Sequence, residues 1–136
     1  MALTAAGAQS LDPHRWNNRL LILVDTSDDQ LKLGRQLDQL RTEATGLRDR
    51  KLVVYQFNNE AYRTGLDVAA DWTPGTLPAT LTNRIKNDGS FQLFLIGLDG
   101  GVKLHRDDVT RPETIFSLID GMPMRRAELR RRSDYD

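Results

Sequence analysis

The sequence has 136 residues, the length of one domain, and its 39% apolar and 28% charged side chains are typical of a globular protein. Nineteen basic residues balance nineteen acidic ones, so no net charge attracts nucleic acid or anionic lipid, and no apolar run approaches the roughly 20 residues that cross a bilayer. The absence of cysteine excludes disulfides, thiolate metal sites and cysteine nucleophiles, and with them thiol–disulfide exchange and thiol peroxidase activity.

Residues 1–15 are predicted to form a flexible N-terminal tail. Residues 2–10 are mostly small and include Ala6-Gly7-Ala8, which is similar to the small-residue end of a signal peptide. A complete signal also has a charged start and an apolar stretch of about 7–15 residues, and neither is present. Two interpretations stay open, a plain tail or the remnant of an exported precursor.

The first half of the chain predicts two strands joined by a helix. Arg19–Asp25 is a nearly continuous apolar run, typical of a strand covered on both faces. Apolar residues then recur at spacings of three and four, which predicts one helix over about residues 28–47. Residues 51–57 (KLVVYQF) are rich in β-formers and predict the second strand.

The second half predicts a long connection, a hairpin and a final helix. Residues 58–80 contain several glycines and prolines, which indicates a loop, with a short helix over about 77–86. Residues 91–98 and Val102–Arg106 are predicted as a β-hairpin around Asp99-Gly100-Gly101. Pro112 is expected to open the last helix, which ends near Gly121.

This order of elements predicts a thioredoxin-like α/β fold. Its core would be a central mixed β-sheet of about four to five strands, flanked by helices on both faces, with a right-handed crossover between the first two strands. The domain would span residues 16–128. Residues 129–136 contain Arg130-Arg131-Arg132 followed by two aspartates, and they are predicted to be a charged, mobile tail.

The junction of the first strand and its helix is one candidate site. Thioredoxin-like proteins place their thiol there, at the start of the helix. Here the junction has carboxylates and hydroxyls instead: Asp25, Thr26, Ser27 and Asp28. Such residues either cap the helix or form the site of a non-thiol enzyme, with or without the assistance of a metal. The proline that such folds place before the third strand is also missing, and no glycine-rich phosphate loop is present, so no cofactor is predicted.

The segment after the last predicted helix is the second candidate site, with the sequence Met122-Pro123-Met124-Arg125-Arg126. Methionines adapt to irregular apolar surfaces, and paired arginines can bind carboxylate or phosphate in bidentate fashion. Arg125 and Arg126 are therefore candidate ligands for an anion. The alternative is that they bond helix-end carbonyls or local acids such as Glu128.

Lys103, His105 and Arg106 form a second basic cluster, on the predicted return strand of the hairpin. Whether this cluster converges with Arg125 and Arg126 cannot be read from one sequence. His105 and Asp107 are two residues apart, but a metal site needs further ligands, and a solvated loop is the preferred interpretation. No metal site is predicted.

Four sequence motifs resemble the P-DUDES domain, a family found in bacteria and in vertebrate extracellular sushi-repeat proteins. They are Trp16-x-x-Arg19, Asp49-Arg50, Gly97-x-Asp99-Gly100-Gly101-Val102-Lys103 and Met122-Pro123-Met124-Arg125-Arg126-x-Glu128. The resemblance covers about residues 16–128. It implies a thioredoxin-like fold related to peroxiredoxins and without an established activity, and it supplies no catalytic residues. It also implies export, to the periplasm or the extracellular space; otherwise the protein would be cytoplasmic.

The leading hypothesis is a non-redox binding module that presents arginines to a small anionic ligand or to a protein partner. One alternative is a non-thiol enzyme at the junction of the first strand and its helix. Another is a structural domain that oligomerises through the apolar residues of segment 122–124. The sequence leaves the oligomeric state open.

Overall fold

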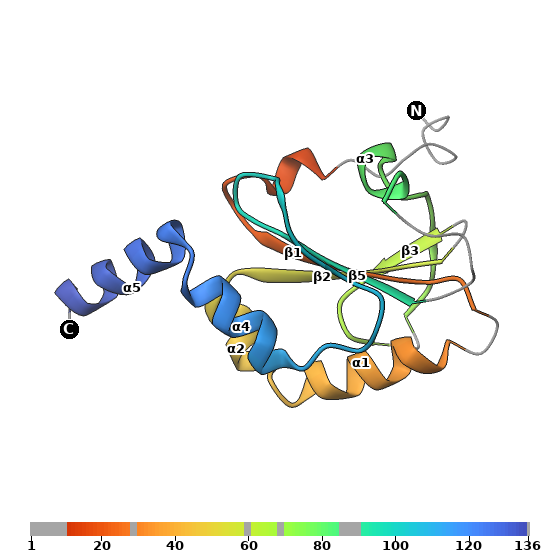
Figure 1. Cartoon of the computed structure of the whole chain (residues 1–136), viewed down its shortest axis with the longest axis horizontal. Helices are drawn as coiled ribbons and strands as arrows, with labels where there is room; N and C mark the ends of the chain where they lie inside the picture. The colour runs from red at the N-terminus through yellow and green to blue at the C-terminus, as the bar shows by residue number, and fades with distance from the viewer. Residues whose placement is uncertain (1–10, 28–29, 59–60, 68–69, 85–90, 136) are drawn as a thin grey trace.

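The computed structural model describes residues 11–27, 30–58, 61–67, 70–84 and 91–135. A six-stranded mixed sheet lies at its centre, with helices on both faces (Figure 1), which confirms the predicted thioredoxin-like class of architecture. The elements in chain order are η2 (Asp12–His14), β1 (Arg19–Asp25), α1 (Leu31–Arg41), α2 (Ala44–Asp49), β2 (Leu52–Phe57), β3 (Ala61–Thr64), β4 (Thr73–Pro74), α3 (Ala79–Thr82), β5 (Phe91–Ile96), β6 (Val102–Arg106), α4 (Pro112–Asp120) and α5 (Pro123–Tyr135).

The strands are arranged in the order β4-β3-β2-β1-β5-β6. β1 pairs in parallel with β2 and antiparallel with β5, so it is central, and all seven of its residues are buried. This burial explains why its sequence is an uninterrupted apolar run rather than an alternating one. The sheet has more strands than the four to five predicted, because β3 and β4 lie in the segment that was expected to be a loop.

β3 forms because the chain turns back onto β2 through one asparagine. The Asn58 side-chain oxygen accepts a hydrogen bond from the Ala61 N–H at 2.7 Å, and the Asn58 N–H donates to the Ala61 carbonyl at 3.0 Å. β4 is only two residues long and includes Pro74, which is tolerated because the strand is at the edge of the sheet. The glycines and prolines of this segment indicated a loop, so the sequence pattern did not predict either strand.

The single helix predicted over residues 28–47 is wrong in extent, since the structure has two helices there. α1 ends at Arg41, where the hydroxyl of Thr42 donates to the Gln39 carbonyl at 2.8 Å, a bond that competes with helix continuation. α2 then packs closely on α4. The closeness is shown at Gly46, where an added Cβ atom would lie only 2.7 Å from the Phe116 ring. Residues 28 and 29, where the predicted helix began, lie outside the described residues.

Each face of the sheet has its own apolar core. One face packs against α1, α2 and α4, and its central residues include Leu21, Leu23, Leu37 and Ile115. The opposite face carries Leu20, Ile22, Phe94 and Ile96, and it is covered by Leu11 near η2 and by Leu77 and Leu81 near α3. The helices of the second face are short, and this face holds the pocket described below.

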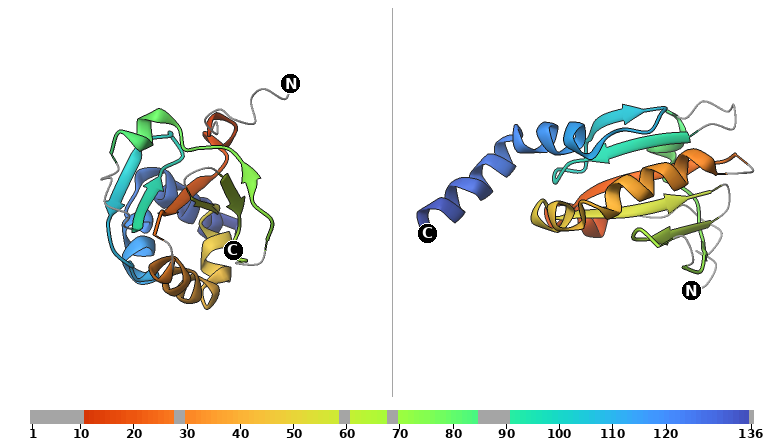
Figure 2. Two further views of the ribbon diagram at one scale, coloured as in Figure 1. Left: turned by 90° about the vertical axis from the view of Figure 1, so that its right-hand side faces the viewer. Right: turned by 90° about the horizontal axis from the view of Figure 1, so that it is seen from below.

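The C-terminal part of the chain is more helical than expected. α4 has the predicted position, but a second helix, α5, follows at Pro123 and continues through Tyr135, into the segment that was predicted to be a mobile tail. Figures 1 and 2 show α5 leading away from the sheet. Among the described residues, no helix is both long and apolar enough to cross a membrane.

Candidate functional site

The junction of β1 and α1 is occupied by its own hydrogen bonds. Asp25 is 1% exposed. One of its carboxylate oxygens accepts from the Ser27 N–H at 2.9 Å and from the Ser27 hydroxyl, and the other accepts from the Leu33 N–H at 3.2 Å. The Ser27 hydroxyl oxygen in turn accepts from the N–H of Gln30, a residue in the left-handed region with φ 50°.

Asp25 therefore caps the first turn of α1. Backbone N–H groups at a helix start attract an anion, and here that anion is a carboxylate of the same chain. Thr26 is half-buried beside it, and Asp28 lies outside the described residues. Within the described ranges, no three His, Asp or Glu side chains are grouped as the ligands of a metal ion would be.

Arg125 lies in the middle of an ion-pair network rather than on the surface. Its side chain is 2% exposed, and every nitrogen of its guanidinium is bonded. Nη2 lies 2.6 Å from the Asp49 carboxylate, and Nε lies 3.1 Å from the Asp120 carboxylate. Nη1 lies 3.4 Å from the Glu128 carboxylate and donates to the backbone carbonyl of Asp49 at 3.0 Å. Four of the five N–H donors of this buried guanidinium are bonded within the chain, so the structure favours the alternative in which Arg125 bonds local acids.

The same carboxylates bind further arginines. Arg19, which is 1% exposed, contacts Glu128 at 3.4 Å and donates to the Arg50 carbonyl at 2.9 Å. Arg50 binds Asp120 at 2.9 Å, and Arg132 binds Asp49 at 2.8 Å. The network thus joins β1, the end of α2, α4 and α5, and it fixes the base of α5 to the domain.

An acid-dependent stability is expected from this network. The hydrogen bond from Arg125 holds the pKa of Asp49 below its ordinary value of 3.8, against the opposing effect of burial. The hydrogen bond from Arg50 has the same effect on the pKa of Asp120. A pKa that is lowered by folding stabilises the folded state above the unfolded value, and this stabilisation is lost as the pH falls through the folded value.

We therefore expect Asp49→Asn to flatten the loss of stability between about pH 5 and pH 2, measured by urea denaturation at a series of pH values. Glu43→Gln is the control, since Glu43 is exposed and its side chain makes no capping hydrogen bond. Identical pH curves for Asp49→Asn and the unmodified chain would contradict the role of this carboxylate.

The other predicted basic residues lie on different elements. Arg126 is exposed on α5, whereas the second basic cluster lies on β6, at the edge of the sheet. Lys103 pairs with Asp99 at 2.9 Å, and Arg106 is exposed. His105 stacks on Phe94, with ring centroids 4.3 Å apart, and its Nε2 lies 2.6 Å from the Gln92 side-chain oxygen.

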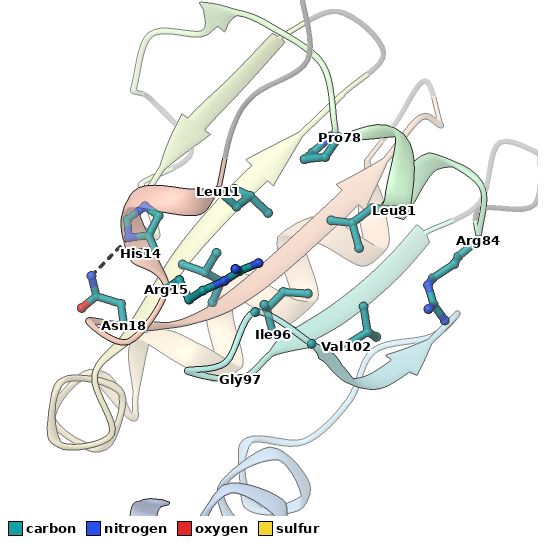
Figure 3. Close-up of a pocket in the computed structure, with 13 residues that line it drawn as sticks. Leu11, His14, Arg15, Asn18, Pro78, Leu81, Arg84, Ile96, Gly97 and Val102 are labelled. Atoms are coloured by element: carbon teal, nitrogen blue, oxygen red, sulfur yellow. Dashed lines mark hydrogen bonds between the residues drawn. The ribbon is translucent and has the colours of Figure 1, made fainter.

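A pocket of about 470 Å³ lies on the second face of the sheet, bounded by η2, the following turn, α3 and the β5–β6 turn (Figure 3). Sequence reasoning did not find it. Its lining includes six apolar side chains, those of Leu11, Leu20, Pro78, Leu81, Ile96 and Val102.

Two arginines border this pocket, Arg15 and Arg84. In Figure 3 they lie on opposite sides of the patch formed by Ile96 and Val102. Both are exposed, and within the described part of the chain neither has an ion pair or a side-chain hydrogen bond. None of the described lining residues is acidic. This contrasts with Arg125, whose charge is neutralised by three carboxylates.

A strained turn positions Arg15. The next residue, Trp16, has φ 69°, in the left-handed region that bulky residues rarely adopt, and its N–H donates to the Leu98 carbonyl at 2.6 Å. Trp16 itself is 59% exposed. The Arg15 side chain lies against Gly100, where a Cβ atom would be 3.0 Å from Nε. Backbone strain of this kind is concentrated at functional sites.

The remaining polar side chains of the pocket are bonded to one another. His14 Nδ1 lies 3.1 Å from the Asn18 side-chain nitrogen, and His14 Nε2 lies 2.7 Å from the Tyr55 hydroxyl. His14 is half-buried.

The motifs that define the resemblance fall into two places. Arg19, Asp49-Arg50, Arg125 and Glu128 meet in the ion-pair network. Trp16 and the turn from Gly97 to Lys103 meet beside the pocket, where Asp99 accepts from the Gly101 N–H at 2.9 Å and binds Lys103. The first set anchors α5, and the second shapes one wall of the pocket.

The chain has a thioredoxin-like α/β fold. Solved structures similar to it include the mitochondrial 2-Cys peroxiredoxin from Plasmodium falciparum, with a TM-score of 0.54 and 10% identity over 82% of this chain and 79% of that one. The 2-Cys peroxiredoxin from Plasmodium vivax in its reduced form has a TM-score of 0.52 and 14% identity, over 81% and 68% of the two chains. The apo form of Trgpx has a TM-score of 0.53 and 19% identity, over 82% and 83%.

These likenesses concern the fold alone. Residues 10–128 match the family described as a domain of unknown function, DUF4174, and the chain belongs to that family. No curated protein matches the sequence. The chain has no cysteine, so the β1–α1 junction has no thiol for peroxidase chemistry.

Proposed function

We propose that this protein is a non-redox binding module, and that it binds an anionic ligand, or an anionic group of a partner, in the pocket between η2, α3 and the β5–β6 turn. The observation that supports this proposal is the pair of arginines at the border of an apolar pocket, Arg15 and Arg84, which have no ion-pair partner among the residues that the structure describes. Arginine binds carboxylate and phosphate groups with charge-assisted, bidentate hydrogen bonds.

The proposal keeps the predicted class of function and changes the residues that perform it. The guanidinium of Arg125 is buried and bonded to local acids, and the residues of the second basic cluster lie on the edge strand β6. We do not propose an enzyme at the β1–α1 junction, because both carboxylate oxygens of Asp25 accept hydrogen bonds from the helix start. Nor do we propose self-association through segment 122–124, in which Met122 packs on the core.

We also propose that the chain is a P-DUDES-type domain that acts in the periplasm or outside the cell. The support is the order and spacing of the four motifs given above. A fusion of the complete natural gene product to a reporter that is active only after export tests the location. A reporter that stays inactive in cells that contain the intact fusion would contradict it.

Binding is tested by titrating ¹⁵N-labelled protein with sodium phosphate, sulfate, acetate and octanoate at constant ionic strength. We expect at least one of these anions to shift the amide signals of Gly97, Gly100, Gly101 and Val102, which line the pocket. The double variant Arg15→Ala, Arg84→Ala should weaken binding roughly ten- to a hundredfold, because hydrogen bonds to charged groups contribute about 1.5–3 kcal/mol.

The matched control is Arg126→Ala with Arg130→Ala, which removes two exposed arginines of α5 and the same amount of charge. It should leave the affinity unchanged. Equal weakening by the two double variants would mean that only net charge matters and would reject the pocket. A titration in which no anion shifts the pocket amides would also reject it.

A further inference from the structure

We propose that the ligand of this pocket is an amphipathic carboxylate, an apolar chain of about six to ten carbons with a terminal carboxylate, and that Arg15 holds the carboxylate. This inference rests on the proposed function and specifies the chemical class of its ligand. Three features of the pocket support it: its lining, its size and the placement of Arg15.

The lining matches an apolar chain better than a small inorganic anion. Leu11, Pro78 and Val102 are half-buried and expose apolar surface at the pocket, and the other apolar lining residues, Leu20, Leu81 and Ile96, are buried. A phosphate ion would contact the arginines and leave this apolar surface exposed to water. An alkyl chain would cover it, and each methylene group transferred from water to an apolar site strengthens binding roughly fourfold.

The size of the pocket agrees with this class. A volume of about 470 Å³ lies within the range of roughly 300–1,000 Å³ that is typical of small-molecule sites. The polar side chains at the pocket are few, and His14 and Asn18 are bonded to each other. A ligand with one charged end and no further polar groups therefore leaves none of these side chains unsatisfied.

Arg15 is better positioned than Arg84 to hold the carboxylate. The bond from the Trp16 N–H to the Leu98 carbonyl fixes the turn that carries Arg15, and its guanidinium lies against Gly100. Because Gly100 has φ 84° and no side chain, Arg15 can lie close to the backbone of the β5–β6 turn. Arg84 follows the short helix α3, on the opposite side of Val102 (Figure 3).

The test is a calorimetric or NMR titration of the full chain with acetate, butanoate, hexanoate, octanoate, 1-octanol and inorganic phosphate. We expect affinity to rise roughly fourfold per added methylene group, and octanoate to bind at least tenfold more tightly than 1-octanol. Arg15→Ala should reduce octanoate to the affinity of 1-octanol. Arg84→Ala should have a smaller effect.

A second variant tests the apolar part separately. Val102→Thr has nearly the same shape and adds a hydroxyl to the lining, so it should weaken octanoate severalfold and leave acetate unchanged. Gly100→Ala should weaken octanoate, because the added Cβ would displace Arg15. Circular dichroism confirms that each variant is folded.

The outcomes separate the two proposals. If phosphate binds as tightly as octanoate and depends on Arg15, the anion site stands and the ligand class is wrong. If 1-octanol equals octanoate, the carboxylate has no role, and both the ligand class and the anion site fail. If no compound in the series binds, both proposals fail as well.

Discussion

Replacing Arg125 with alanine is expected to lower the free energy of unfolding by about 3–5 kcal/mol, the usual effect of removing one partner from a buried ion pair. The guanidinium is 2% exposed and is the common partner of Asp49, Asp120 and Glu128. Its removal leaves three carboxylates close together without their shared cation. Urea denaturation followed by circular dichroism measures the change.

Arg126→Ala is the matched control for this prediction. Arg126 is the next residue on the same helix, and it is exposed, so its replacement should change stability by less than about 0.5 kcal/mol. A double-mutant cycle of Arg125→Ala with Asp49→Ala measures the coupling of that pair directly. If Arg125→Ala were as mild as Arg126→Ala, the network would not anchor α5.

Asp25→Ala is expected to cost roughly 2–4 kcal/mol, because it leaves the N–H groups of Ser27 and Leu33 without their acceptor. The Leu33 amide is buried, so water cannot replace the carboxylate there. Asp25→Asn should lie between the alanine variant and the unmodified chain, because its amide retains one acceptor oxygen. Thermal and urea denaturation measure both variants.

Glu43→Ala is the control for Asp25, since it also removes a carboxylate close to a helix start, but its side chain makes no capping hydrogen bond. We expect it to change stability by less than about 0.5 kcal/mol. An Asp25→Asn variant with unchanged stability would overturn the capping role. That result would favour the alternative hypothesis, a non-thiol enzyme at this junction.

Local sequence patterns correctly predicted the elements that have a regular apolar pattern or a clear turn or helix-start signal. The apolar run of β1, the hairpin of β5 and β6, and the start of α4 at Pro112 all lie where the pattern placed them. The missed elements depend on contacts that local patterns do not encode. β3 is held by pairing with β2, and the base of α5 by the network around Arg125.

The candidate sites show the same division. Arg125 and Arg126 are adjacent and identical in type, so the sequence could not distinguish them. The helical rotation between neighbouring positions turns Arg125 toward Asp49 and leaves Arg126 exposed. Arg15 and Arg84 belong to distant segments with no shared motif, and only the packing of η2 and α3 on the sheet places them at one pocket.

The sequence by itself determined the chemistry that this protein lacks and the class of its fold. The absence of cysteine is a property of the covalent chain and does not depend on how the chain folds. Hydrophobic periodicity is a local property, so it predicts helices and strands without any knowledge of the tertiary contacts. The tertiary structure decided which charges are available for binding. An arginine is neutralised or left free according to the carboxylates that folding brings within a few ångströms, and those carboxylates come from segments far apart in the chain.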